Sequence, residues 1–296
     1  MTILVIGTGS IGTRHAANLA TLGERVKPVS MRAVGLEGAL AQIRAGLRGA
    51  VIATETQLRL PLIAACAAAD VPMYVEKPLA FDPVELAAIL DVSAPVAARS
   101  LVGFMMRYHP TFRDLAAADL SDTYRFSFDI GHDVTQWRQN CRFSESYAAR
   151  PAGGGVLLDL CHELDMATCL FPMAEISAVE SIGHASYPGV DMATRISLAG
   201  AALGSVSMDY LSPVSTRKID IAGVRTRRSI DMLSVAFVRN EMFLAAMRDW
   251  LALIDGHAVS GVDHLPRLDL VADSCARIAA AWQARRFVGL MNGEKP

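Results

Sequence analysis

Three short segments of the sequence combine residue types that could support a reaction. The first, Gly7–Gly12, reads GTGSIG, and the second, at residues 76–78, reads EKP directly after a short apolar run. The third, Gly153–Asp165, reads GGGVLLDLCHELD. A glycine loop that opens a helix suits a phosphate. Lysine, histidine and carboxylate groups suit proton transfer.

The glycine segment has the spacing G-x-G-x-x-G, between an expected strand at residues 2–7 and an expected helix. This context is the one in which the pattern indicates a dinucleotide site. Gly7 permits the tight turn, Gly9 lets the backbone approach a pyrophosphate, and Gly12 lets helix and strand pack closely. Ser10 and Ile11 lie between them and join the candidate cofactor-binding residues. The alternative is an ordinary strand-to-helix turn with chance glycines.

The residues after the second expected strand bear on the choice of cofactor. An NAD site usually has Asp or Glu about 20 residues past the loop, for the ribose 2′-hydroxyl. No acid occurs from Arg25 to Leu36, where Ser30 and Arg32 stand instead. These residues suit a 2′-phosphate, so we expect NADP over NAD, with NAD possible; the alternative is that Arg32 is a solvated surface residue. Thr54, Glu76 and Lys77 complete the candidate cofactor contacts.

Composition excludes several classes of protein. The 296 residues carry a net charge of -2 without a basic stripe, which argues against a nucleic-acid partner. No run approaches the roughly 20 apolar residues that a membrane span needs. The first strand is expected from about Thr2, leaving no room for a targeting peptide. The five cysteines form no C-x-x-C pair, so we expect free thiols, a cytoplasmic location and no metal site.

The order of apolar segments predicts an α/β domain followed by an α+β domain. Over the first hundred residues, short apolar runs alternate with helical patterns, as they do in βαβ units. This alternation predicts an N-terminal Rossmann domain with a doubly wound parallel sheet at residues 1–106. One helix is expected at about residues 36–47. Later segments such as TYRFSFDIG alternate apolar and polar residues without helices between them. This grouping predicts an open, mainly antiparallel sheet in a substrate-binding and oligomerisation domain at residues 107–296.

Glu76 and Lys77 lie at the carboxyl end of an expected strand, where doubly wound sheets bind ligands. A lysine there can donate to a substrate oxygen, and its proton affinity is tuned by neighbouring charges. Pro78 fixes the turn and could follow a cis peptide bond. The alternative is a surface ion pair before a turn, and the residues alone do not decide between the two readings.

The third segment offers a second proton-transfer group. Asp159 directly precedes a helical pattern, where an N-cap is expected. His162 and Asp165 follow at intervals of three, so all three can share one helix side. Histidine titrates near neutrality and can move a hydroxyl proton. The alternative is that His162 is a satisfied core residue, and Asp165 is interpreted as structural.

These elements together resemble the glucose–fructose oxidoreductase/inositol dehydrogenase (Gfo/Idh/MocA) family. Four segments occur in the family's order, and the likeness covers nearly the whole chain: GTGSIGTRH, the EKP segment, VGFMMRYHP and GGGVLLDLCHELD. The resemblance implies a Rossmann domain, a C-terminal open sheet and hydride transfer between a nicotinamide and a sugar or cyclitol carbon. Lys77 matches the family's catalytic lysine, and Asp159 and His162 match its Asp and His near the substrate. Those two are four apart in the inositol dehydrogenases and three apart here.

Five further residues are candidates for substrate contact. Arg107 and Tyr108 follow the last Rossmann strand and match an R-aromatic-x-P position of the family. Their alternative role is packing at a domain junction. The other three lie in the loop before the glycine run: Trp137, Arg138 and Tyr147. Their side chains could stack on a sugar or pair with a carboxylate. The alternative is that this segment is an ordinary surface loop.

The sequence thus predicts an NADP-preferring oxidoreductase acting on a secondary hydroxyl of a sugar, amino-sugar or cyclitol. Lys77, His162 and Asp159 are the predicted catalytic residues. Two alternatives remain open: a reductase of another carbonyl, imine or linear tetrapyrrole, and a regulator that binds NADP without chemistry. The open sheet predicts a homodimer or homotetramer, because an exposed sheet face is commonly covered by a second subunit. No nucleic-acid or membrane partner is expected.

Overall fold

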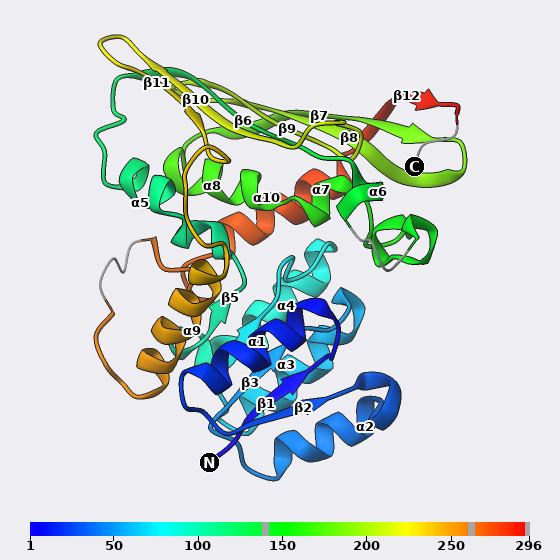
Figure 1. Cartoon of the computed structure of the whole chain (residues 1–296), viewed down its shortest axis with the longest axis vertical. Coiled ribbons are helices and arrows are strands. Elements are labelled where there is room, and N and C mark those ends of the chain that lie inside the picture. The colour runs from blue at the N-terminus through cyan, green and yellow to red at the C-terminus, as the bar shows by residue number, and fades with distance from the viewer. Residues whose placement is uncertain (138–141, 260–263, 294–296) are drawn as a thin grey trace. The chain divides into compact units, whose positions relative to one another are not determined.

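The computed structural model describes residues 1–137, 142–259 and 264–293 (Figure 1). The chain forms two compact units, each built from two segments. The first unit contains Met1–His109 and Phe237–Cys275, and the second contains Pro110–Ala236 and Ala276–Pro296. The sequence-based boundary after residue 106 treats each domain as one continuous segment, whereas the chain returns to the first unit after completing most of the second.

The first unit is built on a five-stranded parallel sheet with the order β2-β1-β3-β4-β5. This order makes the sheet doubly wound, because the chain proceeds from β1 in one direction and then crosses to the other side at β3. Pro28 is tolerated in β2 because β2 is an edge strand. The strands are β1 (Ile3–Ile6), β2 (Val26–Val29), β3 (Gly49–Ile52), β4 (Met73–Val75) and β5 (Leu101–Val102).

Four helices connect these strands: α1 (Ser10–Thr21), α2 (Met31–Arg44), α3 (Arg59–Ala68) and α4 (Pro83–Ser93). Asp82 caps α4, since its side chain accepts hydrogen bonds from the backbone N–H groups of Val84 and Glu85. Helix α2 begins five residues before the expected start at Leu36. Gly35 interrupts it with a φ of +66°, so the sequence pattern marked only the part after the break.

Helix α9 (Asn240–Ile254) belongs to the first unit although it follows the second sheet in sequence. Its buried side packs near α1, with the ring of Phe243 5.8 Å from that of His15. Trp250 is fully buried, and its ring lies 6.1 Å from that of Tyr74 in β4. An amphipathic pattern predicts which side of a helix is buried, but not which domain it covers.

The second unit is built on a seven-stranded sheet with the order β11-β10-β6-β9-β8-β7-β12. The pairs β6–β9 and β7–β12 are parallel and the other four are antiparallel, so the prediction of an open, mainly antiparallel sheet is confirmed. The strands are β6 (Thr123–Gly131), β7 (Glu175–His184), β8 (Tyr187–Ala199), β9 (Leu203–Asp209), β10 (Thr216–Gly223), β11 (Arg227–Asp231) and β12 (Arg286–Met291).

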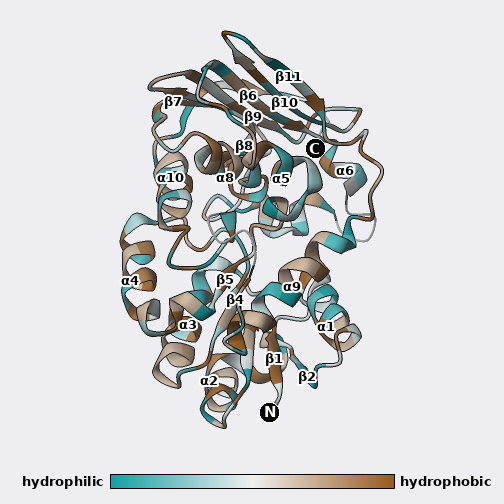
Figure 2. Cartoon of the chain, turned by 90° about the vertical axis from the view of Figure 1, so that its left-hand side faces the viewer, coloured by the Kyte–Doolittle hydropathy of each residue, from teal (hydrophilic) through white to brown (hydrophobic). Residues whose placement is uncertain are grey.

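The helices described in this unit pack on one face of its sheet (Figure 1). Apolar side chains such as Phe128, Val206 and Ile219 are buried on that face, while their neighbours along each strand are polar and more exposed. Figure 2 shows this mixture of hydropathy along the strands. The helices are α5 (Pro110–Ala116), α6 (Val134–Trp137), α7 (Val156–Asp159) and α8 (His162–Leu170), together with α10 (Ala272–Gln283), which spans the division between the units.

Candidate active site

The glycine loop meets the steric requirements of a dinucleotide site. Gly7 has a φ of +107°, and a Cβ there would lie 2.4 Å from the carbonyl oxygen of Ala53. A Cβ on Gly12 would lie 1.9 Å from the carbonyl oxygen of Gly7, so α1 and the loop approach too closely for a side chain. A Cβ on Gly9 would meet nothing within 4 Å. The fold therefore requires glycine at positions 7 and 12, whereas a side chain at position 9 would enter open space.

This loop lies where the sheet changes direction. It follows β1, and Ala53 and Thr54 follow the adjacent strand β3, so both loops leave the same carboxyl edge of the sheet. Ligands of doubly wound sheets bind at this point. Gly9 occupies the N-cap position of α1 without a side-chain cap, and the first N–H groups of a helix lack partners within it. The exposed Ser10 and half-buried Ile11 thus present backbone donors that fit a phosphate.

The end of β2 carries the residues that would distinguish the cofactors. Ser30 is half-buried at the N-cap position of α2, and Arg32 is exposed in the first turn of that helix. The first acid after the strand is Glu37, beyond the break at Gly35. Thr54 is 9% exposed. Of Ser30, Arg32 and Thr54, Arg32 carries a charge, and that charge is positive.

Glu76 is buried at the carboxyl end of β4 and is held by a residue from the helix after the glycine loop. Nε2 of His15 lies 2.7 Å from Oε1 of Glu76, and His15 is fully buried against the ring of Tyr74. Gly103 passes close by, since a Cβ there would lie 3.0 Å from the carboxylate. His15 was not among the predicted site residues. The sequence feature that could have indicated His15 is its position in the segment GTGSIGTRH, five residues after Ser10.

The turn after Glu76 is held from inside by a buried arginine. The guanidinium of Arg59 donates to the carbonyl oxygens of Glu76, Pro78 and Thr54, which joins the loops after β3 and β4. The Lys77–Pro78 peptide bond is cis, as the sequence allowed, and Lys77 is half-buried. Burial alone would raise the pKa of Glu76, but the hydrogen bond from His15 and the charges of His15, Lys77 and Arg59 hold it below its ordinary value.

In the second unit, the predicted N-cap role of Asp159 is wrong. Asp159 is the last residue of α7, and the N-cap position of α8 is taken by Cys161. Asp159 and His162 therefore lie on different helices, because the helical conformation is interrupted at residues 160 and 161. The two residues do not share one helix side. His162 and Asp165 do lie on α8, and they are 7% and 0% exposed.

Two tyrosines hold the carboxylate of Asp159. The hydroxyl of Tyr210 donates to Oδ2 of Asp159 at 2.9 Å, and that of Tyr147 donates to Oδ1. Tyr210 is 1% exposed and follows the end of β9. Burial raises the pKa of Tyr210 well above its ordinary value, and the charge of Asp159 raises it further, so the phenol remains a donor. Tyr210 was not predicted, because it lies 51 residues from its partner in sequence.

The glycine run before α7 is fixed by a buried ion pair. Gly155 has a φ of +93°, and a Cβ there would lie 2.0 Å from Oδ1 of Asp191. Asp191 is fully buried, accepts a hydrogen bond from the backbone N–H of Leu157 at 2.9 Å and pairs with the guanidinium of Arg285. At Gly155 the backbone therefore lies close to a carboxylate of the protein itself, that of Asp191.

The remaining predicted substrate residues lie in different settings. Arg107 is buried in the first unit and donates to the hydroxyl of Ser274 at 3.1 Å, while Tyr108 is 6% exposed. Tyr147 is 38% exposed and bonds Asp159. Trp137 ends α6, and only its backbone is described. Arg138 lies outside the described residues.

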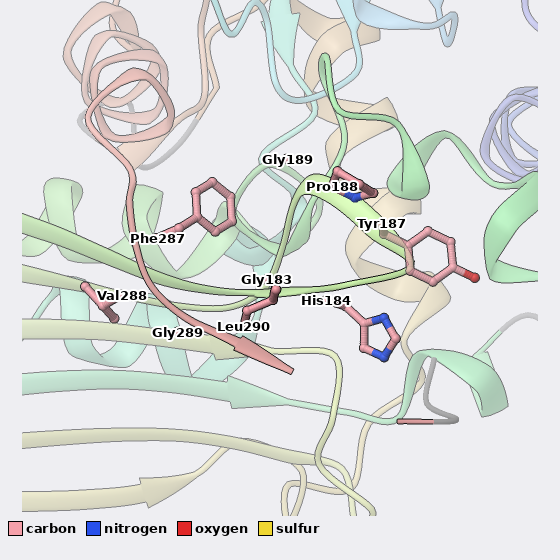
Figure 3. A pocket seen from close by; sticks show the side chains of 9 residues that line it. All are labelled: Gly183, His184, Tyr187, Pro188, Gly189, Phe287, Val288, Gly289 and Leu290. Atoms are coloured by element: carbon pink, nitrogen blue, oxygen red, sulfur yellow. The ribbon is translucent and has the colours of Figure 1, made fainter. Parts of the chain in front are cut away.

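An open groove of about 470 Å³ lies elsewhere in the second unit, between the β7–β8 turn and β12 (Figure 3). Its lining includes His184, Tyr187, Phe287 and Leu290, and none of the predicted site residues. Within the described parts of the chain, no group of three or more His, Cys, Asp or Glu side chains is arranged to hold a metal ion. No helix described is long and apolar enough to cross a membrane.

A doubly wound sheet with a glycine loop where it changes direction, combined with an open antiparallel sheet, defines the two-domain fold of the Gfo/Idh/MocA-type dehydrogenases. The resemblance found in the sequence is thereby confirmed at the level of the fold. No family model matches the chain. Myo-inositol dehydrogenase Hyg17 of Streptomyces leeuwenhoekii is 30% identical over 131 residues, which cover 40% of this chain and 40% of that protein. The match thus spans less than half of the curated relative.

Solved structures match over nearly the full length. GenD2 from gentamicin A biosynthesis, in complex with NAD, has a TM-score of 0.74 and 19% identity, over 96% of this chain and 93% of that one. UDP-N-acetylglucosamine 3-dehydrogenase GnnA of Acidithiobacillus ferrooxidans has a TM-score of 0.74 and 18% identity, over 96% and 95%. A myo-inositol dehydrogenase of Corynebacterium glutamicum has a TM-score of 0.73 and 17% identity, over 96% and 97%. At these identities the matches establish the fold.

Proposed function

We propose that the protein is a nicotinamide-dependent oxidoreductase acting on a secondary hydroxyl, or the corresponding ketone, of a sugar, amino-sugar or cyclitol. One observation carries this proposal: the glycine loop is closed to side chains at Gly7 and Gly12 and open at Gly9, on the sheet edge where Lys77 follows β4. The names of proteins with this fold support the substrate class, since they include inositol and UDP-N-acetylglucosamine dehydrogenases.

The residues of the first unit would hold the cofactor. Backbone donors at Gly9, Ser10 and Ile11 suit its pyrophosphate, and Thr54 and Glu76 follow the two neighbouring strands. Ser30 and Arg32 suit a 2′-phosphate, so we propose a preference for NADP, with NAD also accepted. When bound, the nicotinamide supplies the hydride acceptor or donor.

Proton transfer is assigned to Lys77 and His162. During oxidation the substrate hydroxyl loses its proton as its C–H hydride leaves, so a base must accept that proton. The amine of Lys77 or the imidazole of His162 takes it, and returns it when the reaction runs as a reduction. Asp159, held by two phenols, has its orientation fixed and serves the substrate as an acceptor. Arg107, Tyr108, Trp137, Arg138 and Tyr147 remain predictions for substrate contact.

Replacing Lys77 tests this assignment directly. The variant Lys77→Met should bind NADPH within about threefold of wild type by fluorescence titration and lose at least about 100-fold in kcat, because general acid–base catalysis contributes 10²–10⁴-fold. Lys27→Met, an exposed lysine in β2, is the matched control and should keep full turnover. Substrates would first be found by a thermal-shift screen of sugars and cyclitols with NADPH present.

The result also separates the alternatives. A regulator without chemistry would bind NADPH and show no turnover with any polyol in wild type. A tetrapyrrole reductase would bind a linear tetrapyrrole, whereas a sugar enzyme would not. Full turnover in Lys77→Met would contradict the role given to this lysine. We further propose a homodimer or homotetramer, since one face of the seven-stranded sheet lacks helices among the residues described.

A further inference from the structure

The segment after α10 reaches back to the glycine run through a buried ion pair. Arg285 directly precedes β12 and Asp191 lies on β8, and their side chains are 8% and 0% exposed. Both residues belong to the second unit, as the glycine run does. A buried ion pair adds little to stability, because the desolvation of each ion offsets their attraction. The geometry that the pair imposes is therefore more informative than its contribution to stability.

Asp191 caps the short helix α7 from β8. Gly155, at the N-cap position of α7, has no side chain that could accept a hydrogen bond from the first turn. Oδ2 of Asp191 takes this role and accepts from the backbone N–H of Leu157 at 2.9 Å. The missing Cβ of Gly155 makes room for the carboxylate, since that atom would lie 2.0 Å from Oδ1 of Asp191. A carboxylate from another strand thus replaces the cap that the glycine lacks.

The carboxylate of Asp191 is itself held in one orientation. Oγ1 of Thr194 donates to Oδ2 of Asp191 at 2.9 Å, and it lies 2.8 Å from Oγ of Ser181. Because the hydroxyl of Thr194 gives its one proton to Asp191, the hydroxyl of Ser181 must donate to Thr194. Oδ1 of Asp191 pairs with the guanidinium of Arg285. Each oxygen therefore has its own donors, and the carboxylate cannot turn without breaking them.

Arg285 is fixed by Trp282, which returns to the glycine run. Nε of Arg285 donates to the carbonyl oxygen of Trp282 at 2.8 Å, and the guanidinium carbon lies 4.1 Å from the centre of the Trp282 ring. Nε1 of Trp282 reaches the carbonyl oxygen of Gly154 at 3.4 Å. Gly154, Trp282, Arg285, Asp191 and Gly155 therefore form a closed ring of contacts around the N-terminus of α7.

Helix α7 depends on such contacts because it is too short to hold its own orientation. It has four residues and ends at Asp159, and a single helical turn is not stable by itself. At 1.5 Å per residue the helix is about 6 Å long, so a tilt of about 10° at its N-terminus would move Asp159 by about 1 Å. A misplacement of that size at a reacting site can lower the rate by about 100-fold.

We propose that Asp191 and Arg285 are positioning residues of the substrate site, which fix the N-terminus of α7 and through it the carboxylate of Asp159. The inference rests on the function proposed above and concerns a pair to which that function assigns no role. Neither residue of the pair contacts the substrate, and both act through Asp159. Tyr147 and Tyr210 hold the carboxylate at the other end of the same helix.

A double-mutant cycle of Arg285→Met with Asp159→Ala tests the proposal. Arg285→Met removes the counter-charge of Asp191, so we expect kcat/KM for the polyol to fall about 10- to 100-fold, with NADPH affinity within about twofold of wild type. In the Asp159→Ala background the same replacement should lower kcat/KM less than about threefold, because the residue through which Arg285 acts is already gone. A merely structural role would lower kcat/KM by the same factor in both backgrounds.

Arg277→Met is the matched control on the same helix. The guanidinium of Arg277 donates to the carbonyl oxygens of Pro172 and Ala174, so this variant should lower the melting temperature and keep kcat/KM within about twofold of wild type. Arg285→Lys keeps the charge without the planar fork and should give an intermediate kcat/KM. It takes the place of Arg285→Met in the cycle if that variant does not fold.

Chemical rescue gives an independent readout. Guanidinium chloride at a low, non-denaturing concentration should raise kcat/KM of Arg285→Ala several-fold, whereas the same concentration of sodium chloride should not.

Three results would overturn the positioning role. They are a wild-type kcat/KM in Arg285→Met, an equal loss in both backgrounds of the cycle, and a guanidinium effect that restores the melting temperature of Arg285→Ala without restoring kcat/KM. Turnover of the wild-type protein is measured first. A wild type without turnover would overturn the proposed function and this inference with it, whereas an active wild type with a kinetically normal Arg285→Met would overturn this inference alone.

Discussion

Nε2 of His15 lies 2.7 Å from Oε1 of Glu76, joining the helix that follows the glycine loop to the end of the strand that carries Lys77. Both side chains are buried, at 0% and 7% exposure. A buried carboxylate is costly unless it is hydrogen-bonded or paired. His15 supplies that partner, so this contact links α1 to the EKP turn, which Arg59 also holds.

Glu76→Gln should make the stability of the protein less dependent on pH. A carboxylate whose folded pKa lies below its unfolded value stabilises the fold above that unfolded value, and this contribution is lost as the pH falls through the folded pKa. The variant should lose about 1–3 kcal/mol of unfolding free energy at pH 7, and its deficit relative to wild type should shrink below about pH 4.5. Urea unfolding at several pH values measures this. A deficit that grew on acidification would contradict the lowered pKa, and the exposed Glu37→Gln is the control.

Gly9→Ala and Gly12→Ala should separate cofactor binding from folding. Gly12→Ala must displace the backbone of Gly7, so we expect a loss of about 1–3 kcal/mol or more in unfolding free energy. Gly9→Ala meets nothing within 4 Å and should unfold within about 0.5 kcal/mol of wild type, yet bind NADPH at least about tenfold more weakly. Equal NADPH affinity in Gly9→Ala would argue against a pyrophosphate at this loop.

Arg32→Ala should change the choice of cofactor. If Arg32 contacts a 2′-phosphate, the variant should bind NADPH about tenfold more weakly and NADH within about twofold of wild type, because a charge-assisted hydrogen bond is lost for only one of them. Fluorescence titration of both cofactors measures the ratio. Arg44→Ala, an exposed arginine in the last turn of the same helix, is the matched control. Equal weakening of both cofactors would instead indicate a general electrostatic effect.

Tyr210→Phe should destabilise the region around Asp159. The buried hydroxyl donates to Asp159 and reaches the carbonyl oxygen of Gly155 at 3.2 Å, so its removal takes one donor away from the carboxylate of Asp159. We expect a loss of about 1–3 kcal/mol in unfolding free energy and a fall in kcat/KM as Asp159 loses its orientation. Tyr124→Phe removes the hydroxyl of an exposed tyrosine and should stay within about 0.5 kcal/mol of wild type. A Tyr210→Phe protein as stable as wild type would show that Asp159 does not need this donor.

The fold class and the glycine loop could be predicted because their signals are local. A G-x-G-x-x-G between a strand and a helix is complete within six residues, and the steric demands of Gly7 and Gly12 arise from the turn itself and its nearest strand. The alternation of strands and helices likewise gave the parallel sheet, and alternating polarity gave the open one. Local periodicity also misled: it placed Asp159 at a helix start, because a break of two residues between short helices leaves no mark in the pattern.

Sequence by itself determined which residues could do chemistry: a glycine loop, a lysine at a strand end, and a histidine near a glycine run. Tertiary structure decided what holds them, since His15, Arg59, Tyr210 and Asp191 act on partners that lie from 17 to 94 residues away. It also decided that α9 returns to the first unit. The physical reason is that hydrogen bonds, packing and register between distant segments depend on how the strands and helices are arranged in the folded units, which spacing along the chain does not encode.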